Sequence, residues 1–359
     1  DKAIDILDEA CCKTSIVDSI YEKKNKRLLM EINDVKSNKN KAIINHNYKL
    51  ASELKDKQLE LEIVLNKNAF KNNKNNIIKE ISKDTIYDVV YAKTKIPVKK
   101  LLNLDKNAIY SSLKKKVFGQ DDVIREVLDV TIGYKITKNV PKSLLLVGKT
   151  GVGKTLLVKE YAKLLYTKEA FIRIDMSEFR ESHSISKIIG SPPGYVGYSD
   201  NNYILNRVKN NPYSVILIDE IEKAHPDVLK LFLQVFDDGH MTDSMGECID
   251  FSNSVIFMTS NLGTDVNRIG FLDTNDIIFD RFKAFLGIEF VNRIDKIIYF
   301  NNMDEKAINK IIKEEIKRLG ISMNECSSDV MNKIKEECNY KEFGARHVSK
   351  VLKNYLNNS

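Results

Sequence analysis

A phosphate-binding pattern stands near the middle of the chain. Residues 148–155 read GKTGVGKT, which completes GxxxxGK[ST] between a short apolar run and an amphipathic one, the strand-to-helix setting that this motif requires. In such a loop the backbone N–H groups and the helix N-terminus bind phosphate oxygens. Lys154 is predicted to reach the β- and γ-phosphates and Thr155 to ligate Mg²⁺. The loop consists of Gly148, Lys149, Thr150, Gly151, Val152, Gly153, Lys154 and Thr155.

A second apolar run, residues 215–218, ends on the carboxylates Asp219 and Glu220. Beside a phosphate loop, Asp219 is predicted to hold Mg²⁺ through water, and Glu220 to polarise the attacking water as a general base. The structural alternative is an acidic helix N-cap. A carboxylate pair closing an apolar strand, together with the phosphate loop, favours the catalytic interpretation.

Short β-rich runs alternate with amphipathic segments around these motifs. The runs cover residues 144–147, 171–174, 215–218 and 255–258, and each is followed by a polar turn. This alternation of β-rich and amphipathic segments predicts an α/β fold with a mostly parallel sheet covered on both faces. From about residue 301 the periodicity is helical alone, which predicts a small helical domain. Its apolar positions are Ala307, Ile308, Ile311, Ile312 and Ile316.

Residues 16–65 read as two charged amphipathic helices with a break near residues 37–40. Apolar residues recur at heptad spacing in each arm, so a short antiparallel coiled-coil hairpin is predicted. A rigid spacer and a docking arm for partners are equally open as its role. The seam residues are Leu28, Ile32 and Val35 in one arm and Leu50, Leu54, Leu61 and Leu65 in the other. Residues 66–76 read as a loop or a frayed helix end.

Composition narrows the function classes. The chain has 359 residues, 43% of them hydrophobic, which predicts more than one domain. No apolar run reaches the ~18 residues of a membrane span, and the first residues lack a signal-peptide layout, so a soluble protein is expected. Five cysteines without a CxxC pair disfavour a disulfide scaffold or a zinc site and fit a reducing compartment. The net charge of +7 comes from interspersed acidic and basic residues, which disfavours a nucleic-acid partner.

The segments around Asp219 and Glu220 resemble those of the Clp unfoldases, a group of AAA+ ATPases. Residues 218–226 (IDEIEKAHP) and 238–243 (DGHMTD) are similar to their extended Walker B region, and residues 258–263 (MTSNLG) to their sensor 1 strand. The similarity runs from Val117 almost unbroken to the C-terminus. It implies an AAA+ large domain with a parallel sheet, a small helical domain, and ATP and Mg²⁺ as ligands.

The resemblance implies roles for single residues. Asn261 would be the polar sensor that orients the attacking water, and Arg293, in FVNRID, the arginine finger that reaches the γ-phosphate on the neighbouring subunit. Arg346, in GAR, would tie the small domain to the nucleotide. Val117 and Phe118, in VFGQ, would pack on adenine. From the residues alone, Asn261 reads equally as a strand-end amide that satisfies backbone groups.

Two further loops concern proteins rather than nucleotide. Tyr195 and Val196 lie between two glycines after Pro192-Pro193, and side chains of this kind suit a sequence-tolerant grip on an extended polypeptide. The resemblance makes this the pore loop. Ile269-Gly270-Phe271 places apolar residues in a polar loop, which marks a contact site. Similar unfoldases carry such a tripeptide to dock on a ClpP-like serine protease ring, whereas disaggregases lack it.

The N-terminal part resembles the ClpC type. Residues 1–10 are similar to the end of a first AAA+ ring, and the single short hairpin is similar to a ClpC middle domain. The predicted domains are residues 1–12, the end of a preceding small domain; 13–85, the coiled-coil middle domain; 86–300, the large domain; and 301–359, the small domain. An excised fragment and a naturally shortened form are both open.

The predicted function is ATP hydrolysis between subunits of a homo-hexamer, which threads unfolded or tagged proteins into a ClpP-like protease, with an adaptor on the hairpin and no membrane or nucleic-acid partner. The alternatives are a stand-alone disaggregase, a nucleic-acid motor, which Tyr195 disfavours, and an inactive scaffold. A bias toward Lys, Asn and Ile together with the ClpC-like pattern implies a plastid (apicoplast-like) stroma or a bacterial cytoplasm. Departures from the family pattern are Lys149 for a common Pro, His240 for Arg, and Gly287-Ile288 for Arg-Pro.

Overall fold

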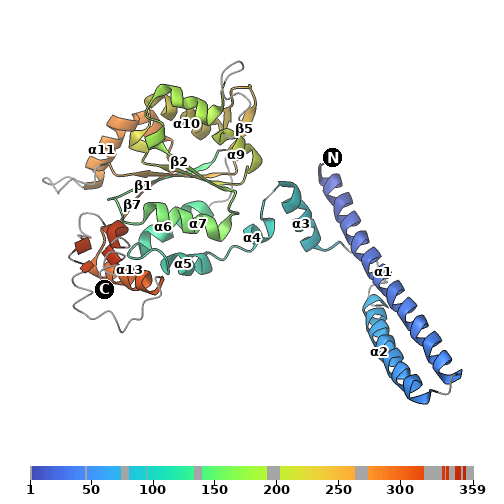
Figure 1. Ribbon diagram of the computed structural model, residues 1–359. Coiled ribbons are helices and arrows are strands. Elements are labelled where there is room, and N and C mark those ends of the chain that lie inside the picture. Colours follow the sequence, from blue (N-terminus) through green and yellow to red (C-terminus); the bar gives the residue numbers. More distant parts are fainter. Residues whose placement is uncertain are drawn as a thin grey trace. The chain divides into compact units, whose positions relative to one another are not determined.

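The computed structural model describes two compact units of the chain, Asp1–Lys99 and Lys100–Ser359. Figure 1 gives the ribbon, in which the helix α4 (Val98–Leu102) covers the boundary in sequence. The described residues are 2–44, 47–73, 81–94, 96–132, 140–191, 203–262, 274–318, 334–335, 337–338, 344–348 and 351–352. Within them, no helix is both long enough and apolar enough to span a membrane.

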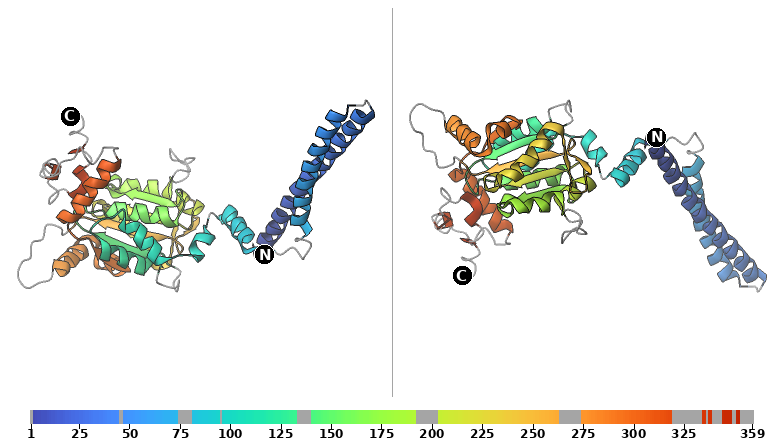
Figure 2. Two further views of the ribbon diagram at one scale, coloured as in Figure 1. Left: turned by 90° about the horizontal axis from the view of Figure 1, so that it is seen from below. Right: turned by 90° about the horizontal axis from the view of Figure 1, so that it is seen from above.

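The first unit is built on a hairpin of two antiparallel helices, α1 (Lys2–Ile44) and α2 (Tyr48–Asn73), which run alongside one another in all three views (Figures 1 and 2). Ile32 is 3% exposed and Ala42 and Ala51 are also buried, while the predicted seam residues Leu28 and Val35 are half-buried. A polar pair joins the helices between these apolar positions, because Lys39 Nζ donates to Gln58 Oε1 at 2.8 Å. Such polar pairs fix the register of a coiled coil at some cost in stability.

Two expectations for the hairpin differ from the structure. Helix α1 runs unbroken through residues 37–40 and the chain turns after Ile44, because weak helix formers cost only a few tenths of a kcal/mol each and packing against α2 outweighs that cost. Leu50 is 44% exposed and its neighbour Ala51 takes the seam position. A third helix, α3 (Lys83–Thr94), follows the hairpin along the chain.

Helix α3 belongs to the first unit. Lys93 Nζ forms an ion pair with Glu9 Oε2 at 3.1 Å, and Val89 and Ala10 are fully buried. These contacts lie within the compact unit that ends at Lys99.

The second unit is organised by a five-stranded sheet in the order β2-β3-β6-β1-β7, and every described pairing in it is parallel. Its strands are β1 (Lys142–Val147), β2 (Phe171–Asp175), β3 (Val215–Asp219), β6 (Val255–Ser260) and β7 (Lys296–Tyr299). The four predicted strands are confirmed. Two further features were not predicted from so few residues: β7, and the antiparallel pair β4 (His240–Thr242) and β5 (Cys248–Asp250).

Helices cover both faces of the sheet, as predicted (Figure 1). Alternate strand residues point to opposite faces, so Leu144 and Leu217 join one core while Leu145 and Ile218 join the other. The first face carries α5 (Lys106–Lys114), α6 (Asp121–Ile132) and α7 (Lys154–Leu165). The other carries α8 (Ser186–Ile189), α9 (Ile204–Asn210), α10 (Pro226–Asp238), α11 (Thr274–Leu286) and α12 (Ile288–Asn292).

A third core belongs to the small helical region that was predicted from residue 301. In α13 (Glu305–Arg318), Ile308, Ile312 and Ile316 are fully buried and pack with Ile334, Cys338, Val348 and Leu352. Short 3₁₀ helices complete the described elements: Met176–Glu178, Ser182–Ile185, Ile221–Lys223 and Gly344–His347. Because carboxyl ends of parallel strands share one edge, the residues after β1, β3 and β6 meet there.

Candidate functional site

The phosphate loop connects β1 to α7 and carries a buried ammonium group. Lys154 is 7% exposed, and its Nζ donates to Lys149 O at 2.9 Å, to Asn261 Oδ1 at 2.8 Å and to Gly148 O. Burial lowers the pKa of Lys154 to about 8, although the nearby carboxylates, Glu222 first, oppose the shift. The lysine therefore stays mainly protonated at neutral pH, in place for an anionic ligand.

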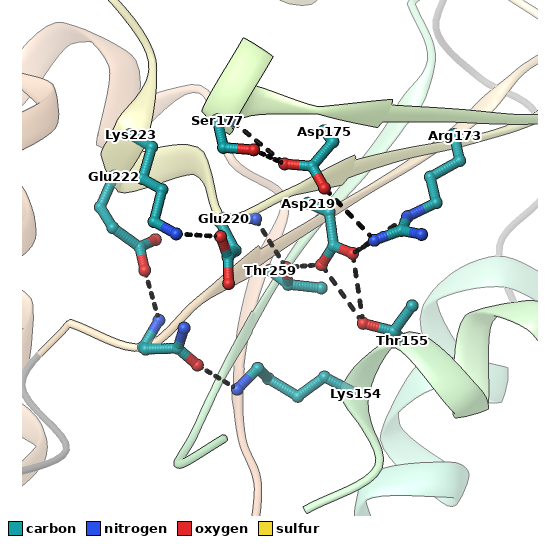
Figure 3. A network of polar contacts seen from close by, with 11 residues as sticks. Lys154, Thr155, Arg173, Asp175, Ser177, Asp219, Glu220, Glu222, Lys223 and Thr259 are labelled. Carbon is teal, nitrogen blue, oxygen red and sulfur yellow. Dashed lines mark hydrogen bonds and ion pairs between the residues drawn. The ribbon is translucent and has the colours of Figure 1, made fainter. Parts of the chain in front are cut away.

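Asp219 ends β3 as a buried carboxylate with partners on both oxygens (Figure 3). Its Oδ1 accepts from the hydroxyls of Thr155 at 3.2 Å and Thr259 at 2.5 Å. Its Oδ2 accepts from Arg173 Nη2 at 2.6 Å and Nε at 3.1 Å. Sequence reasoning missed Arg173 and Thr259; the single sequence signal for Arg173 is a charge inside an otherwise apolar strand.

Glu220 adopts a left-handed backbone conformation with φ of 56°, and no other non-glycine residue in the described part of the chain has a positive φ. Backbone strain of this kind costs roughly 1–3 kcal/mol and persists only where neighbours enforce it. Here the Glu220 backbone N–H donates to Thr259 Oγ1 at 3.0 Å, and Lys223 Nζ forms an ion pair with its carboxylate (Figure 3). The conformation carries the side chain past the end of the strand.

A third carboxylate, Glu222, contacts the residue that follows β6. Its Oε1 accepts from the Asn261 backbone N–H at 3.1 Å, while its Oε2 is buried without a hydrogen-bond partner in the described structure. Together with the Lys154 contact, this fixes Asn261 through both its backbone and its side chain. Sequence reasoning gave Glu222 no role.

Lys154, Asp219, Glu220 and Asn261 border a cavity of about 470 Å³. It brings together most of the predicted site residues, including the proposed adenine segment Val117-Phe118 and Arg346 from the small helical region. The cavity residues that had been predicted are Val117, Phe118, Thr150, Gly151, Val152, Gly153, Lys154, Thr155, Asp219, Glu220, Asn261 and Arg346. Gln120, beside the adenine segment, exchanges two hydrogen bonds with the Asn301 backbone, at 2.8 and 3.0 Å.

Arg293 does not line this cavity. It follows α12, where its guanidinium pairs with Asp237 and with Glu289 Oε1 at 3.2 Å, and the hydrogen bond to Asp237 raises the pKa of Arg293. Tyr195, Val196 and Ile269-Gly270-Phe271 lie outside the described residues.

The small helical region contacts the phosphate loop through its backbone. Ala345 N–H donates to Gly151 O at 3.1 Å. At Gly344, with φ of +59°, a Cβ atom would lie 2.7 Å from the Gly151 carbonyl carbon and 2.8 Å from Thr150 O. Because these neighbours are backbone atoms with little freedom to move, only glycine fits. Gly344, close in sequence to the predicted Arg346, is therefore a further residue whose role sequence reasoning missed.

The donor set suits a small hard cation. Mg²⁺ prefers oxygen ligands and is usually held by one or two protein groups plus phosphates and water. Thr155 Oγ1 and Asp219 Oδ1 lie 3.2 Å apart at the start of α7. Among the described residues no group of three or more His, Cys, Asp or Glu side chains forms a metal site, so these two oxygens fit a cation that is shared with phosphates.

Comparisons with known proteins agree with this geometry. A family model of the AAA domain (Cdc48 subfamily) matches residues 140–297. The chain is 37% identical to the ATP-dependent Clp protease ATP-binding subunit ClpE of Bacillus subtilis, over 99% of this chain and 53% of the relative. It is 35% identical to ClpC of Staphylococcus aureus, over 98% of this chain and 47% of the relative. The chain thus spans about half the length of the curated relatives it matches.

Solved structures give the same result. A closed-state structure of Hsp104 with ATPγS and FITC casein matches with a TM-score of 0.67 and 31% identity, over 86% of this chain and 56% of that one. A Saccharomyces cerevisiae Hsp104:casein complex in an extended conformation matches with a TM-score of 0.68 and 31% identity, over 85% of this chain and 56% of that one.

Replacement of Gly344 by alanine should weaken nucleotide binding about tenfold, because overpacking costs roughly 1–3 kcal/mol and about 1.4 kcal/mol is a factor of ten. The matched control is Gly246→Ala, which carries a similar φ of +81° but has nothing within 4 Å of its Cβ position. Titration of a fluorescent ATP analogue measures both variants. Equal affinities would show that the contact with the phosphate loop does not matter for binding.

Proposed function

Because the chain belongs to the Clp-type AAA+ ATPases, we propose that it hydrolyses ATP in the cavity beside the phosphate loop and uses this energy to unfold proteins. One observation carries the proposal. Lys154, Asp219 and Glu220 reach the same 470 Å³ cavity from two strand ends, although Lys154 lies far from the two carboxylates in sequence. A binding module without hydrolysis would have no need of a strained carboxylate beside a metal ligand.

Each group in the cavity has a part in this chemistry. The phosphate loop backbone and Lys154 bind the β- and γ-phosphates, while Thr155 and Asp219 would hold Mg²⁺, which would supply positive charge to the phosphate oxygens. Glu220 accepts a proton from the attacking water. The amide of Asn261, fixed by Lys154 and Glu222, orients that water, and Arg346 reaches the nucleotide from the small domain.

We assign Arg293 to the site of a neighbouring subunit. It lies outside the cavity of its own chain, yet it is a fixed cation whose side chain keeps 28% of its surface exposed. Such an arginine would supply charge to a γ-phosphate across an interface between subunits, and the resemblance to the Clp unfoldases supports a homo-hexameric ring as that assembly. Asp237 and Glu289 hold the side chain until that interface forms.

The chain spans about half the length of its curated relatives. Its action on protein substrates is therefore proposed from the resemblance to the Clp unfoldases. Tyr195 and Val196 would grip an unfolded or tagged polypeptide in the pore, and Ile269-Gly270-Phe271 would dock on a ClpP-like serine protease. The ClpE and ClpC relatives are ATP-binding subunits of ATP-dependent Clp proteases, which supports protease coupling. The antiparallel hairpin is the place for an adaptor.

A stand-alone disaggregase is the second candidate, and the similarity to Hsp104 structures favours it. The tripeptide Ile269-Gly270-Phe271 distinguishes the two candidates, because disaggregases lack it. For the compartment, the Lys-, Asn- and Ile-rich composition supports a plastid stroma of the apicoplast type, and the bacterial origin of the ClpE and ClpC relatives supports a bacterial cytoplasm. Imaging of the tagged chain against a plastid marker decides between them.

Glu220→Gln should bind ATP normally and lose its hydrolysis, because the amide keeps the size of the side chain but cannot accept the proton. The expected loss in kcat is about 10²–10⁴-fold, typical for a general base. Lys154→Ala should lose binding as well. Phosphate release and nucleotide titration measure the two steps, and hydrolysis by Glu220→Gln at the wild-type rate would contradict the assignment of the base.

Arg293→Ala subunits should inhibit wild-type subunits in mixed rings, because an arginine finger contributes ~10³–10⁵-fold in rate in other phosphoryl-transfer systems and each one here serves a neighbour. The ATPase rate should fall more steeply than the fraction of mutant added. Arg125→Ala is the control, since Arg125 is also ion-paired and exposed but lies away from the cavity. A strictly linear loss in rings shown to mix would mean that each subunit has a complete site.

Tyr195→Ala and Phe271→Ala should fail at different steps. Loss of Tyr195 should abolish threading of a folded fluorescent substrate but keep ATP hydrolysis and protease docking. Loss of Phe271 should keep hydrolysis and unfolding but abolish degradation, because burial of an aromatic side chain contributes roughly 2–3 kcal/mol per subunit and a ring multiplies it by avidity. Unchanged degradation by Phe271→Ala would favour the disaggregase.

A further inference from the structure

The hydroxyl group of Thr259 is shared by two residues of a neighbouring strand (Figure 3). Thr259 lies near the end of β6 and is 1% exposed. Its Oγ1 donates to Asp219 Oδ1 at 2.5 Å and accepts the Glu220 backbone N–H at 3.0 Å. A single buried hydroxyl thus contacts both the carboxylate that is assigned to Mg²⁺ and the backbone of the residue that is assigned as the base.

These two hydrogen bonds constrain different properties of the site. The bond to Asp219 uses one lone pair of Oδ1, while the same oxygen also accepts from the Thr155 hydroxyl at 3.2 Å, the group assigned with Asp219 to Mg²⁺. The bond from Glu220 holds a peptide whose φ of 56° is strained, and without a partner this buried N–H would favour another backbone conformation. A change at Thr259 would therefore move both groups together.

A structural role is the competing interpretation, because buried hydroxyls must find partners in any fold. Three other threonine hydroxyls in the described part of the chain bond locally to their own helix, as Thr131 Oγ1 does to Val127 O at 2.8 Å. Thr259 instead bonds across the sheet to two consecutive residues that carry the proposed chemistry.

We propose that Thr259 is a positioning residue for ATP hydrolysis, whose hydroxyl fixes the backbone of Glu220 and the carboxylate of Asp219 in one arrangement. This inference rests on the proposed function, since it concerns the same cavity. Thr259 transfers no proton to the substrate; it acts through the two residues that it holds.

Thr259→Val tests the inference in the 359-residue chain, because valine has nearly the same shape and lacks the hydroxyl. We expect kcat for ATP to fall about 100-fold, the effect of misplacing a reacting group by about 1 Å, while KM and the Kd of a fluorescent ATP analogue change less than about threefold. Thr259→Ser should recover most of the rate. Thr131→Val, which removes a remote hydroxyl from the same unit, should lower the melting temperature without lowering kcat.

A kcat of Thr259→Val within about threefold of wild type, with only the melting temperature lowered, would overturn the inference and leave the proposed function standing. If the valine variant does not fold, Thr259→Ala provides the same comparison. If the wild-type chain itself does not hydrolyse ATP, the proposed function fails, and a crystal structure of the variant still decides the geometry. Glu220 should then leave the left-handed region, and its retention there, with Asp219 unmoved, would refute the positioning role.

Discussion

Two opposite charges are buried in one site, and the second unit is arranged so that both can stay charged. Lys154 is 7% and Asp219 5% exposed, and a buried charge is costly unless hydrogen bonds and opposite charges compensate it. The compensating groups come from different elements. Carbonyl oxygens of the phosphate loop and of Asn261 accept hydrogen bonds from the Lys154 ammonium group. Arg173, Thr155 and Thr259 donate hydrogen bonds to the Asp219 carboxylate. When an anionic ligand and its cation bind, they can replace some of these hydrogen-bond partners. Neither buried charge is then left without a compensating group.

The strand order makes this compensation geometrically possible. In the order β2-β3-β6-β1-β7, the two strands next to β6 are the ones that lead into the phosphate loop and the carboxylate pair. Register is decisive, because a slip of one residue reverses the face of every side chain on a strand. The fully buried residues on both faces of β3 and β6 exclude such a slip, so apolar packing sets the positions of the polar groups at the strand ends.

The motif residues could be predicted because their chemistry lies in consecutive positions, as in the phosphate loop and in Asp219-Glu220. Arg173, Thr259 and Gly344 could not, because their roles depend on partners from distant segments. A side chain at position 344 would clash only because the small helical region lies against Gly151. The prediction of a break at residues 37–40 was wrong for a related reason. The low helix propensity of these residues amounts to tenths of a kcal/mol, and packing of α1 against α2 outweighs it.

Two of the departures from the family pattern, at Lys149 and at Gly287-Ile288, fall where the network uses a backbone atom or where the side chain is exposed. At Lys149 it is the backbone carbonyl that accepts from Lys154 at 2.9 Å, and the proline that is common there would offer the same carbonyl. Gly287 begins α12 with a φ of 86° and Ile288 is 63% exposed, whereas the orientation of Arg293 depends on Asp237 and Glu289. Substitution is therefore least constrained outside the charge network and most constrained at side chains that complete it, since losing one of those leaves a buried charge without a partner.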